Sequence, residues 1–106
     1  MDVNQKAKEL AYYIKGTREF KTMNKYKEEL ERNKSLKKHL DTYINKKNQI
    51  YSRYKVDDAN KKAAKLDKEY INFFNDPIVI NYMNSTNDFN SMMKKIYASI
   101  ESELLK

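Results

Sequence analysis

The sequence predicts an all-α protein, an antiparallel array of four to five helices with a long C-terminal helix. Gly and Pro occur only once each in 106 residues, so few positions suit the tight turns that β-hairpins need. Apolar residues recur at spacings of three and four along most of the chain, which is the period of one helix face. The length suits a single domain, residues 1–106, with one modest core.

The composition excludes several classes of site. The chain has no cysteine, so disulfides and thiolate metal or iron–sulfur sites are excluded. The first residues do not form the apolar segment of a signal peptide, and no apolar run approaches the ~18 residues of a membrane span. We therefore expect a cytoplasmic protein without membrane insertion, cofactor or metal.

The first helix is expected from Asp2 to Lys15, with Asp2 as its N-cap. Its narrow apolar stripe consists of Val3, Ala7, Leu10, Ala11 and Ile14. Gly16, the only glycine, stands where a C-cap takes a left-handed conformation. Thr17 then caps the second helix, which ends at Asn33 and Lys34. The buried face of this helix consists of Phe20, Met23, Tyr26 and Leu30.

Ser35 is the expected cap of the third helix, whose stripe consists of Leu36, Leu40, Tyr43, Ile50 and Tyr54. Asp57 and Asp58 are poor helix formers, so we place a turn near Lys55–Asp58; a helix that runs through is the alternative. The fourth helix carries Ala59, Ala63, Leu66, Tyr70 and Phe73 on its apolar face.

The last helix is the firmest prediction. Asp76 can cap it, and Pro77 suits the first helical position, where a missing N–H costs nothing. Its apolar face consists of Ile78, Tyr82, Phe89, Met93, Ile96, Ile100 and Leu104. Asn84–Asp88 has weak helix propensity, so a kink is the alternative there. Continuity is favoured because Tyr82 and Phe89 stay in phase across this segment.

The loops are short, so helices adjacent in sequence are expected to pack antiparallel. The apolar stripes are longer than one small domain can cover, and a two-fold homodimer is the commonest solution. The candidates for interface and core are Tyr82, Phe89, Met93, Ile96 and Ile100 on the last helix, with Leu40, Tyr43 and Tyr70 opposite.

A series of motifs extends along nearly the whole chain. In order they are Ala7-x-x-Leu10-Ala11-x-x-Ile14, Thr17-x-x-Phe20 with Tyr26 and Leu30, Leu36 and Leu40-x-x-Tyr43, Asn75-Asp76-Pro77-Ile78-Val79-x-x-Tyr82-Met83, and Phe89-x-x-x-Met93-x-x-Ile96-x-x-x-Ile100. This order resembles the YlbF/YmcA family of small helical proteins of low-GC Gram-positive bacteria, including its YheA-like branch. The segment after Asn75 is the most specific part of the resemblance.

The resemblance implies an all-α homo-oligomer that acts as a regulatory adaptor with other regulatory proteins and has no catalysis of its own. Members of the family affect competence, sporulation and biofilm formation, in a complex linked to the membrane-bound ribonuclease Y. The cysteines that hold an iron–sulfur cluster in some members are absent here, and the chain is basic where many members are acidic or near neutral. A YheA-like paralogue of unknown function is the alternative.

The net charge of +7 raises the question of an anionic partner. Lys61, Lys65 and Lys68 share one helical face in the basic middle of the chain and are the candidates for anion contact. The leading interpretation is a solvated surface, and an RNA-binding basic helical module is the alternative function. The nine tyrosines fit the edges of a core better than base-stacking platforms, because most follow the apolar stripes.

Catalytic motifs are missing from the sequence. His39 is the only histidine, and Leu36 stands where a Glu-x-x-His metal motif would need glutamate. There is also no Gly-rich phosphate loop, nucleophile elbow or Cys/His pair. We therefore expect that the protein is not an enzyme and that His39 lies at the surface or at the edge of the core.

Overall fold

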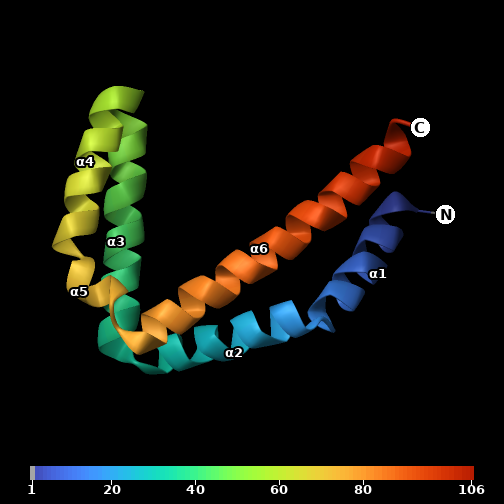
Figure 1. Ribbon diagram of the computed structural model, residues 1–106, viewed down its shortest axis with the longest axis horizontal. Helices are drawn as coiled ribbons and strands as arrows, with labels where there is room; N and C mark the ends of the chain where they lie inside the picture. Colours follow the sequence, from blue (N-terminus) through green and yellow to red (C-terminus); the bar gives the residue numbers. More distant parts are fainter. Residues whose placement is uncertain (1) are drawn as a thin grey trace. The chain divides into compact units, whose positions relative to one another are not determined.

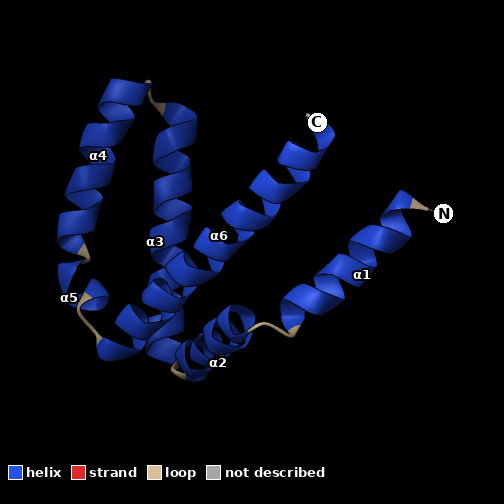
Figure 2. Cartoon of the chain, turned by 45° about the vertical axis from the view of Figure 1, so that its right-hand side comes forward, coloured by secondary structure: helices blue, strands red, loops and turns tan. Residues whose placement is uncertain are grey.

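A computed structural model of the protein describes residues 2–106, and all regular structure in this range is helical (Figures 1 and 2). The helices are α1 (Val3–Lys15), α2 (Arg18–Arg32), α3 (Lys34–Arg53), α4 (Val56–Glu69), α5 (Ile71–Phe74) and α6 (Pro77–Leu104). The all-α prediction with a long C-terminal helix is therefore confirmed, although the helices number six rather than four or five. No helix in residues 2–106 is both long and apolar enough to cross a bilayer.

Three helices begin at the predicted caps. The Asp2 carboxylate accepts a hydrogen bond from the Asn4 amide at 3.0 Å at the start of α1. Thr17 Oγ1 accepts one from the Phe20 amide at 3.2 Å at the start of α2. Asp76 Oδ1 accepts one from the Ile78 amide at 2.9 Å, with Pro77 as the first residue of α6. Each side chain satisfies an amide that has no partner inside its helix.

The cap of α3 differs from the prediction. Asn33 rather than Ser35 caps this helix, because its extended backbone places the side-chain oxygen 3.1 Å from the Leu36 amide. Ser35 lies inside the first turn. The helix is interrupted near the predicted segment Lys55–Asp58, but the break lies earlier: α3 ends at Arg53, the backbone of the next two residues is extended, and α4 already begins at Val56. Asp57 stands in the first turn of α4, where its charge favours the helix dipole.

Gly16 does not adopt the left-handed conformation that we expected. Its φ of −83° and ψ of −7° lie in the right-handed region, and the Gly16 and Thr17 amides donate to the carbonyls of Tyr13 and Ile14. Because this right-handed backbone and these short-range hydrogen bonds continue the sense of the helix, the chain bends between α1 and α2 without reversing (Figure 1). The prediction that consecutive helices pack antiparallel is therefore wrong for this pair.

The fourth helix ends earlier than expected. Tyr70, with φ −101° and ψ 15°, interrupts the helix between α4 and α5, whereas the sequence predicts one helix through Phe73. The rings of Tyr70 and Phe74 lie 5.3 Å and 4.9 Å from the ring of Tyr43. The interruption lets both rings pack on Tyr43, which explains a break that has no local sequence signal.

The last helix is continuous across Asn84–Asp88, as we favoured. Inside this polar segment the Ser85 hydroxyl donates to the Tyr82 carbonyl at 2.9 Å. A serine in a helix interior is satisfied by such a bond to the preceding turn. Asn84–Asp88 is therefore helical in spite of its weak helix propensity.

The chain divides into two compact units. Unit 1 consists of the residues up to Glu28 together with Asn81–Lys106, and unit 2 consists of Glu29–Ile80. In unit 2, α3 and α4 form an antiparallel hairpin (Figure 1), and two buried alanines of α4, Ala59 and Ala63, allow close approach. That the chain is one domain stays a prediction.

The buried hydrophobic residues are distributed unequally. All of those in the described chain lie in unit 2: Leu30, Tyr43, Ala59, Ala63, Leu66, Phe73 and Val79. In unit 1, α2 and α6 contact each other through Phe20 and Phe89, whose rings meet edge to face at 5.9 Å. No described hydrophobic residue of unit 1 is fully buried.

Candidate interaction surfaces

The predicted residues of α6 form a partly exposed apolar stripe. We define the α6 stripe as Phe89, Met93, Ile96 and Ile100, which follow one another at spacings of four, three and four. Phe89, Met93 and Ile96 are half-buried, and Ile100 is 45% exposed. The side of α6 that the sequence predicts to be buried is therefore incompletely covered in the single chain.

Other large apolar side chains of unit 1 are also exposed. They are Val3, Leu10, Tyr12, Tyr13, Met83, Tyr97, Leu104 and Leu105. Scattered exposed hydrophobic residues are normal, but this unit combines many of them with the lack of a buried core among its described residues. Surfaces of this kind are typical of sites where another protein binds.

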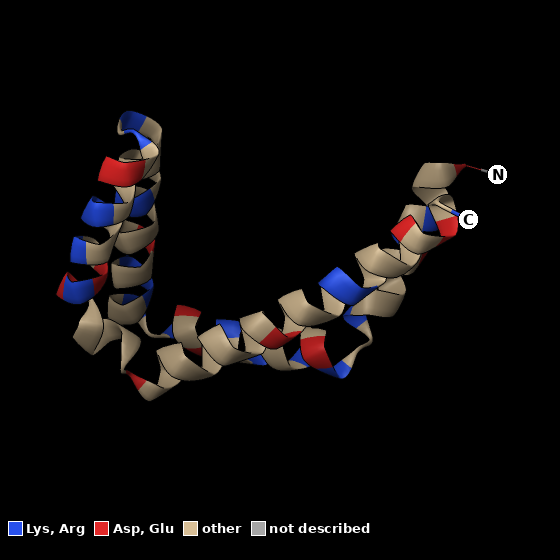
Figure 3. Ribbon diagram, turned by 45° about the horizontal axis from the view of Figure 1, so that its top comes forward, with Lys and Arg blue, Asp and Glu red and all other residues tan. Residues whose placement is uncertain are grey.

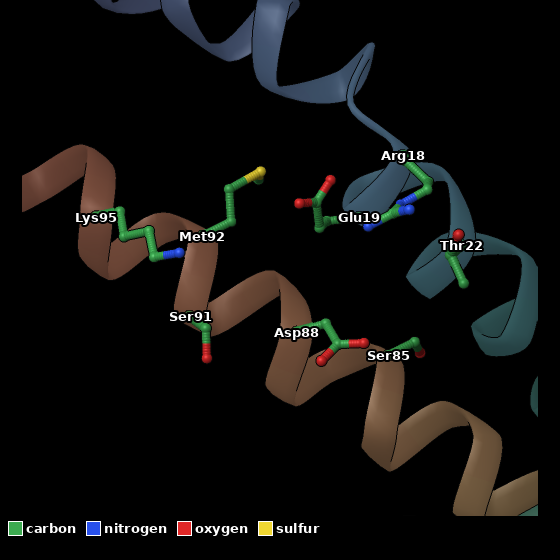
Figure 4. A pocket seen from close by; sticks show the side chains of 8 residues that line it. All are labelled: Arg18, Glu19, Thr22, Ser85, Asp88, Ser91, Met92 and Lys95. Carbon is green, nitrogen blue, oxygen red and sulfur yellow. The ribbon is translucent and has the colours of Figure 1, made fainter.

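A polar cavity of about 510 Å³ also lies in unit 1, between α2 and α6 (Figure 4). Its lining consists of Arg18, Glu19, Thr22, Ser85, Asp88, Ser91, Met92 and Lys95. Figure 4 shows Glu19 and Met92 extending into the space between the two helices. Two cations and two carboxylates balance each other in this lining, so the cavity favours neither an anion nor a cation.

The one buried polar side chain of the cavity lining already has a partner on its own helix. Ser85 is 5% exposed, and its hydroxyl donates to the Tyr82 carbonyl. In residues 2–106, no three or more His, Cys, Asp and Glu side chains are arranged to hold a metal ion. The cavity thus offers hydrogen-bonding surface beside the α6 stripe.

A polar bridge joins the two helices of the hairpin in unit 2. The Tyr43 hydroxyl on α3 donates to Asp67 Oδ1 on α4 at 2.5 Å and accepts a hydrogen bond from Lys47 Nζ at 2.9 Å. Lys47 Nζ also lies 3.9 Å from Asp67 Oδ1. Tyr43 is only 9% exposed, so its hydroxyl group needs these partners.

The bridge shifts two pKa values in the same direction. Burial raises the pKa of Tyr43 above its ordinary value, and the hydrogen bond to Asp67 raises the pKa further. The hydrogen bond to Tyr43 raises the pKa of Lys47. At neutral pH the bridge therefore consists of a neutral tyrosine and a charged lysine.

Several aromatic residues of unit 2 form a cluster around Tyr43. Besides Tyr70 and Phe74, the cluster includes Phe73, whose ring lies 6.1 Å from that of Tyr70. His39 is exposed, as expected, and its ring meets the edge of Phe73 at 6.2 Å.

The structure separates the predicted interface and core candidates by unit. It brings Tyr43 and Tyr70 into contact in unit 2, with Leu40 half-buried on α3. Tyr82 and the four residues of the α6 stripe lie in unit 1.

A basic groove runs along the hairpin of unit 2. We use this name for the lining residues Lys46, Gln49, Ile50, Arg53, Tyr54, Lys62, Lys65, Leu66 and Glu69, which enclose about 290 Å³. Lys62 Nζ lies over the Tyr54 ring, 4.5 Å from its centroid. Figure 3 shows basic residues along both helices of the hairpin.

The groove differs from the predicted anion-contact face. Of Lys61, Lys65 and Lys68, only Lys65 lines the groove, and the other two are exposed on α4 outside the lining. Lys46 and Arg53 reach the groove from α3; the sequence predicts that α3 and α4 pack antiparallel, but not which faces of the two helices meet. The positions of Lys46 and Arg53 in the sequence therefore do not predict that they line a groove together with Lys65.

The chain matches a model of a known protein family over nearly its whole length. The family model described as control of competence regulator ComK, YlbF/YmcA, matches residues 3–104. No curated protein and no solved structure matches the chain. The match extends over all six helices and thus covers both units.

Proposed function

The chain belongs to the YlbF/YmcA family of competence-control regulators, and from this we propose that it is a non-catalytic regulatory adaptor of the cytoplasm. In this proposal it associates with a second copy of itself and with other regulatory proteins. The processes served are those that the family resemblance implies: competence, sporulation, biofilm formation or RNA processing. A paralogue with another role, similar to the YheA-like branch, is the alternative.

The observation that supports this proposal is the contrast between the two units. Unit 2 has buried hydrophobic residues of its own, whereas unit 1 leaves the α6 stripe and its other large apolar side chains partly exposed. Removing apolar surface from water contributes about 25 cal/mol per Å². A second copy that covers the α6 stripe by two-fold symmetry would bury the same residues on both chains.

Two single variants test this proposal. One places a negative charge on the α6 stripe, and the other places the same charge on the opposite side of α6. Ile100→Glu introduces a carboxylate where the side chain is already 45% exposed, so the single chain can accommodate it. We expect multi-angle light scattering to give the monomer mass for this variant and an oligomer for the parent protein. A carboxylate buried against an apolar partner surface is strongly unfavourable, which is the reason for the expected dissociation.

Ala98→Glu is the matched control. Ala98 is exposed and lies two residues from both Ile96 and Ile100, on the opposite face of the helix. The control should keep the parent mass, and circular dichroism should show unchanged helix content in both variants. Equal masses for the parent and Ile100→Glu would remove the α6 stripe from the interface. Phe89→Asp is expected to weaken folding as well as assembly, because Phe89 is half-buried against Phe20.

A further inference from the structure

We propose that the basic groove of unit 2 binds an acidic, amphipathic segment of a protein partner. This inference rests on the proposed function, since it gives the chemistry of a partner for the adaptor. The site is distinct from the α6 stripe, which lies in unit 1.

The charges of the groove favour a partner rich in carboxylates. Its lining contains four cations, Lys46, Arg53, Lys62 and Lys65, against one acid, Glu69. Within the described chain, none of these four cations forms an ion pair with a carboxylate. The nearby Asp67 instead accepts the hydrogen bond of Tyr43 and faces Lys47. The uncompensated positive charge therefore attracts an acidic ligand.

Apolar side chains also line the groove, and they favour a ligand that has apolar groups between its charges. Leu66 is 5% exposed and Ile50 is half-buried, and both belong to the lining. A volume of about 290 Å³ is at the lower end of ligand pockets, which hold roughly 300–1,000 Å³. The groove thus has room for one or two apolar side chains, with carboxylates on either side. An acidic segment with apolar residues on one face has this pattern.

Single-stranded RNA is the competing occupant, and the geometry favours it less. RNA recognition at such a site depends on an open aromatic face on which a base can stack. Tyr54 is the one aromatic residue of the lining, and Lys62 Nζ occupies a position 4.5 Å from the centre of its ring.

The test uses the full chain and three labelled probes in fluorescence anisotropy. The first probe is a short peptide with leucines at helical spacing and glutamates elsewhere, the second has glutamine in place of every glutamate, and the third is oligouridine. We expect the acidic peptide to bind, with an affinity that falls as salt rises because exposed charges are screened. The glutamine peptide should not bind, and oligouridine should bind more weakly than the acidic peptide.

Two double variants separate the groove from general positive charge. Lys62→Glu with Lys65→Glu alters the groove, and Lys61→Glu with Lys68→Glu makes the same change of charge on the same helix outside it. The groove variant should bind the acidic peptide about tenfold more weakly, or about 1.4 kcal/mol. The affinity of the control variant should stay within about twofold of that of the parent protein.

Three results would overturn the inference: no binding of the acidic peptide, equal losses in the two variants, or tighter binding of oligouridine that the groove variant abolishes. Light scattering keeps this test separate from that of the proposed function. Both double variants should retain the parent mass, because neither changes the α6 stripe. If the parent protein is monomeric and still binds the acidic peptide, the proposed self-association is contradicted, but the inference about the basic groove is not.

Discussion

Tyr43 links the two helices of the hairpin through both its ring and its hydroxyl group. The ring packs against Tyr70 and Phe74, and the hydroxyl group bridges Asp67 and Lys47. The apolar pattern predicts Tyr43 at the core, since it follows the stripe of the third helix. The pattern does not predict Asp67 as a partner, because the two residues are 24 positions apart and meet only once the helices pair.

This bridge makes the stability of unit 2 sensitive to alkaline pH. The pKa values of Tyr43 and Lys47 are both raised on folding, so the folded chain holds these protons more tightly than the unfolded chain. Their contribution is complete below the ordinary pKa values of about 10 and is lost as the pH rises through the raised values. We therefore expect the melting temperature to fall above pH ~10, and to fall less in Tyr43→Phe.

Thermal melts followed by circular dichroism at neutral and alkaline pH check this expectation. Tyr97→Phe is the control, because Tyr97 is 61% exposed and makes no hydrogen bond within the described chain. The control should lose as much melting temperature at alkaline pH as the parent protein. If Tyr43→Phe also behaved like the parent, the bridge would not contribute to the pH dependence.

At the scale of helices, three of the starts follow from the predicted capping side chains, whereas the break at Tyr70 does not follow from local sequence. Asp2, Thr17 and Asp76 cap their helices as the sequence predicts, because a cap depends on residues within three positions. The break at Tyr70 has neither glycine nor proline beside it. It depends on rings that pack onto Tyr43 from another helix, and such tertiary contacts override local propensity.

Gly16 gives a direct test of the bend between α1 and α2. Its backbone lies in the right-handed region, and a Cβ at this position would lie 3.4 Å from the Tyr13 carbonyl oxygen, at the edge of ordinary contact. Gly16→Ala should therefore raise the free energy of unfolding by about 0.4–1 kcal/mol, since alanine restricts the unfolded chain.

Urea unfolding measures this change. A loss of more than about 1 kcal/mol would indicate that Gly16 needs the left-handed conformation of a helix C-cap, as the sequence alone suggested. A small gain or no change would support the bend that the structure shows.

At the scale of the whole molecule, the two units differ in hydrophobic burial: both expose large apolar side chains, but the described residues of unit 1 include no buried hydrophobic one. The sequence predicts the α6 stripe because its period is local to one helix. It does not predict the basic groove, because Lys46 and Lys65 meet only through the pairing of α3 with α4. Nor does it reveal that the buried hydrophobic residues of the described chain all belong to unit 2.

The central claim is that the apolar surface of unit 1 is covered by a second copy of the chain. Sedimentation equilibrium of the unmodified protein across the micromolar range tests it most directly, because assembly depends on concentration and the mass of one chain is 12.7 kDa. We predict a mass of at least two chains, which decreases on dilution towards that of one. A mass of 12.7 kDa at every concentration would contradict the account.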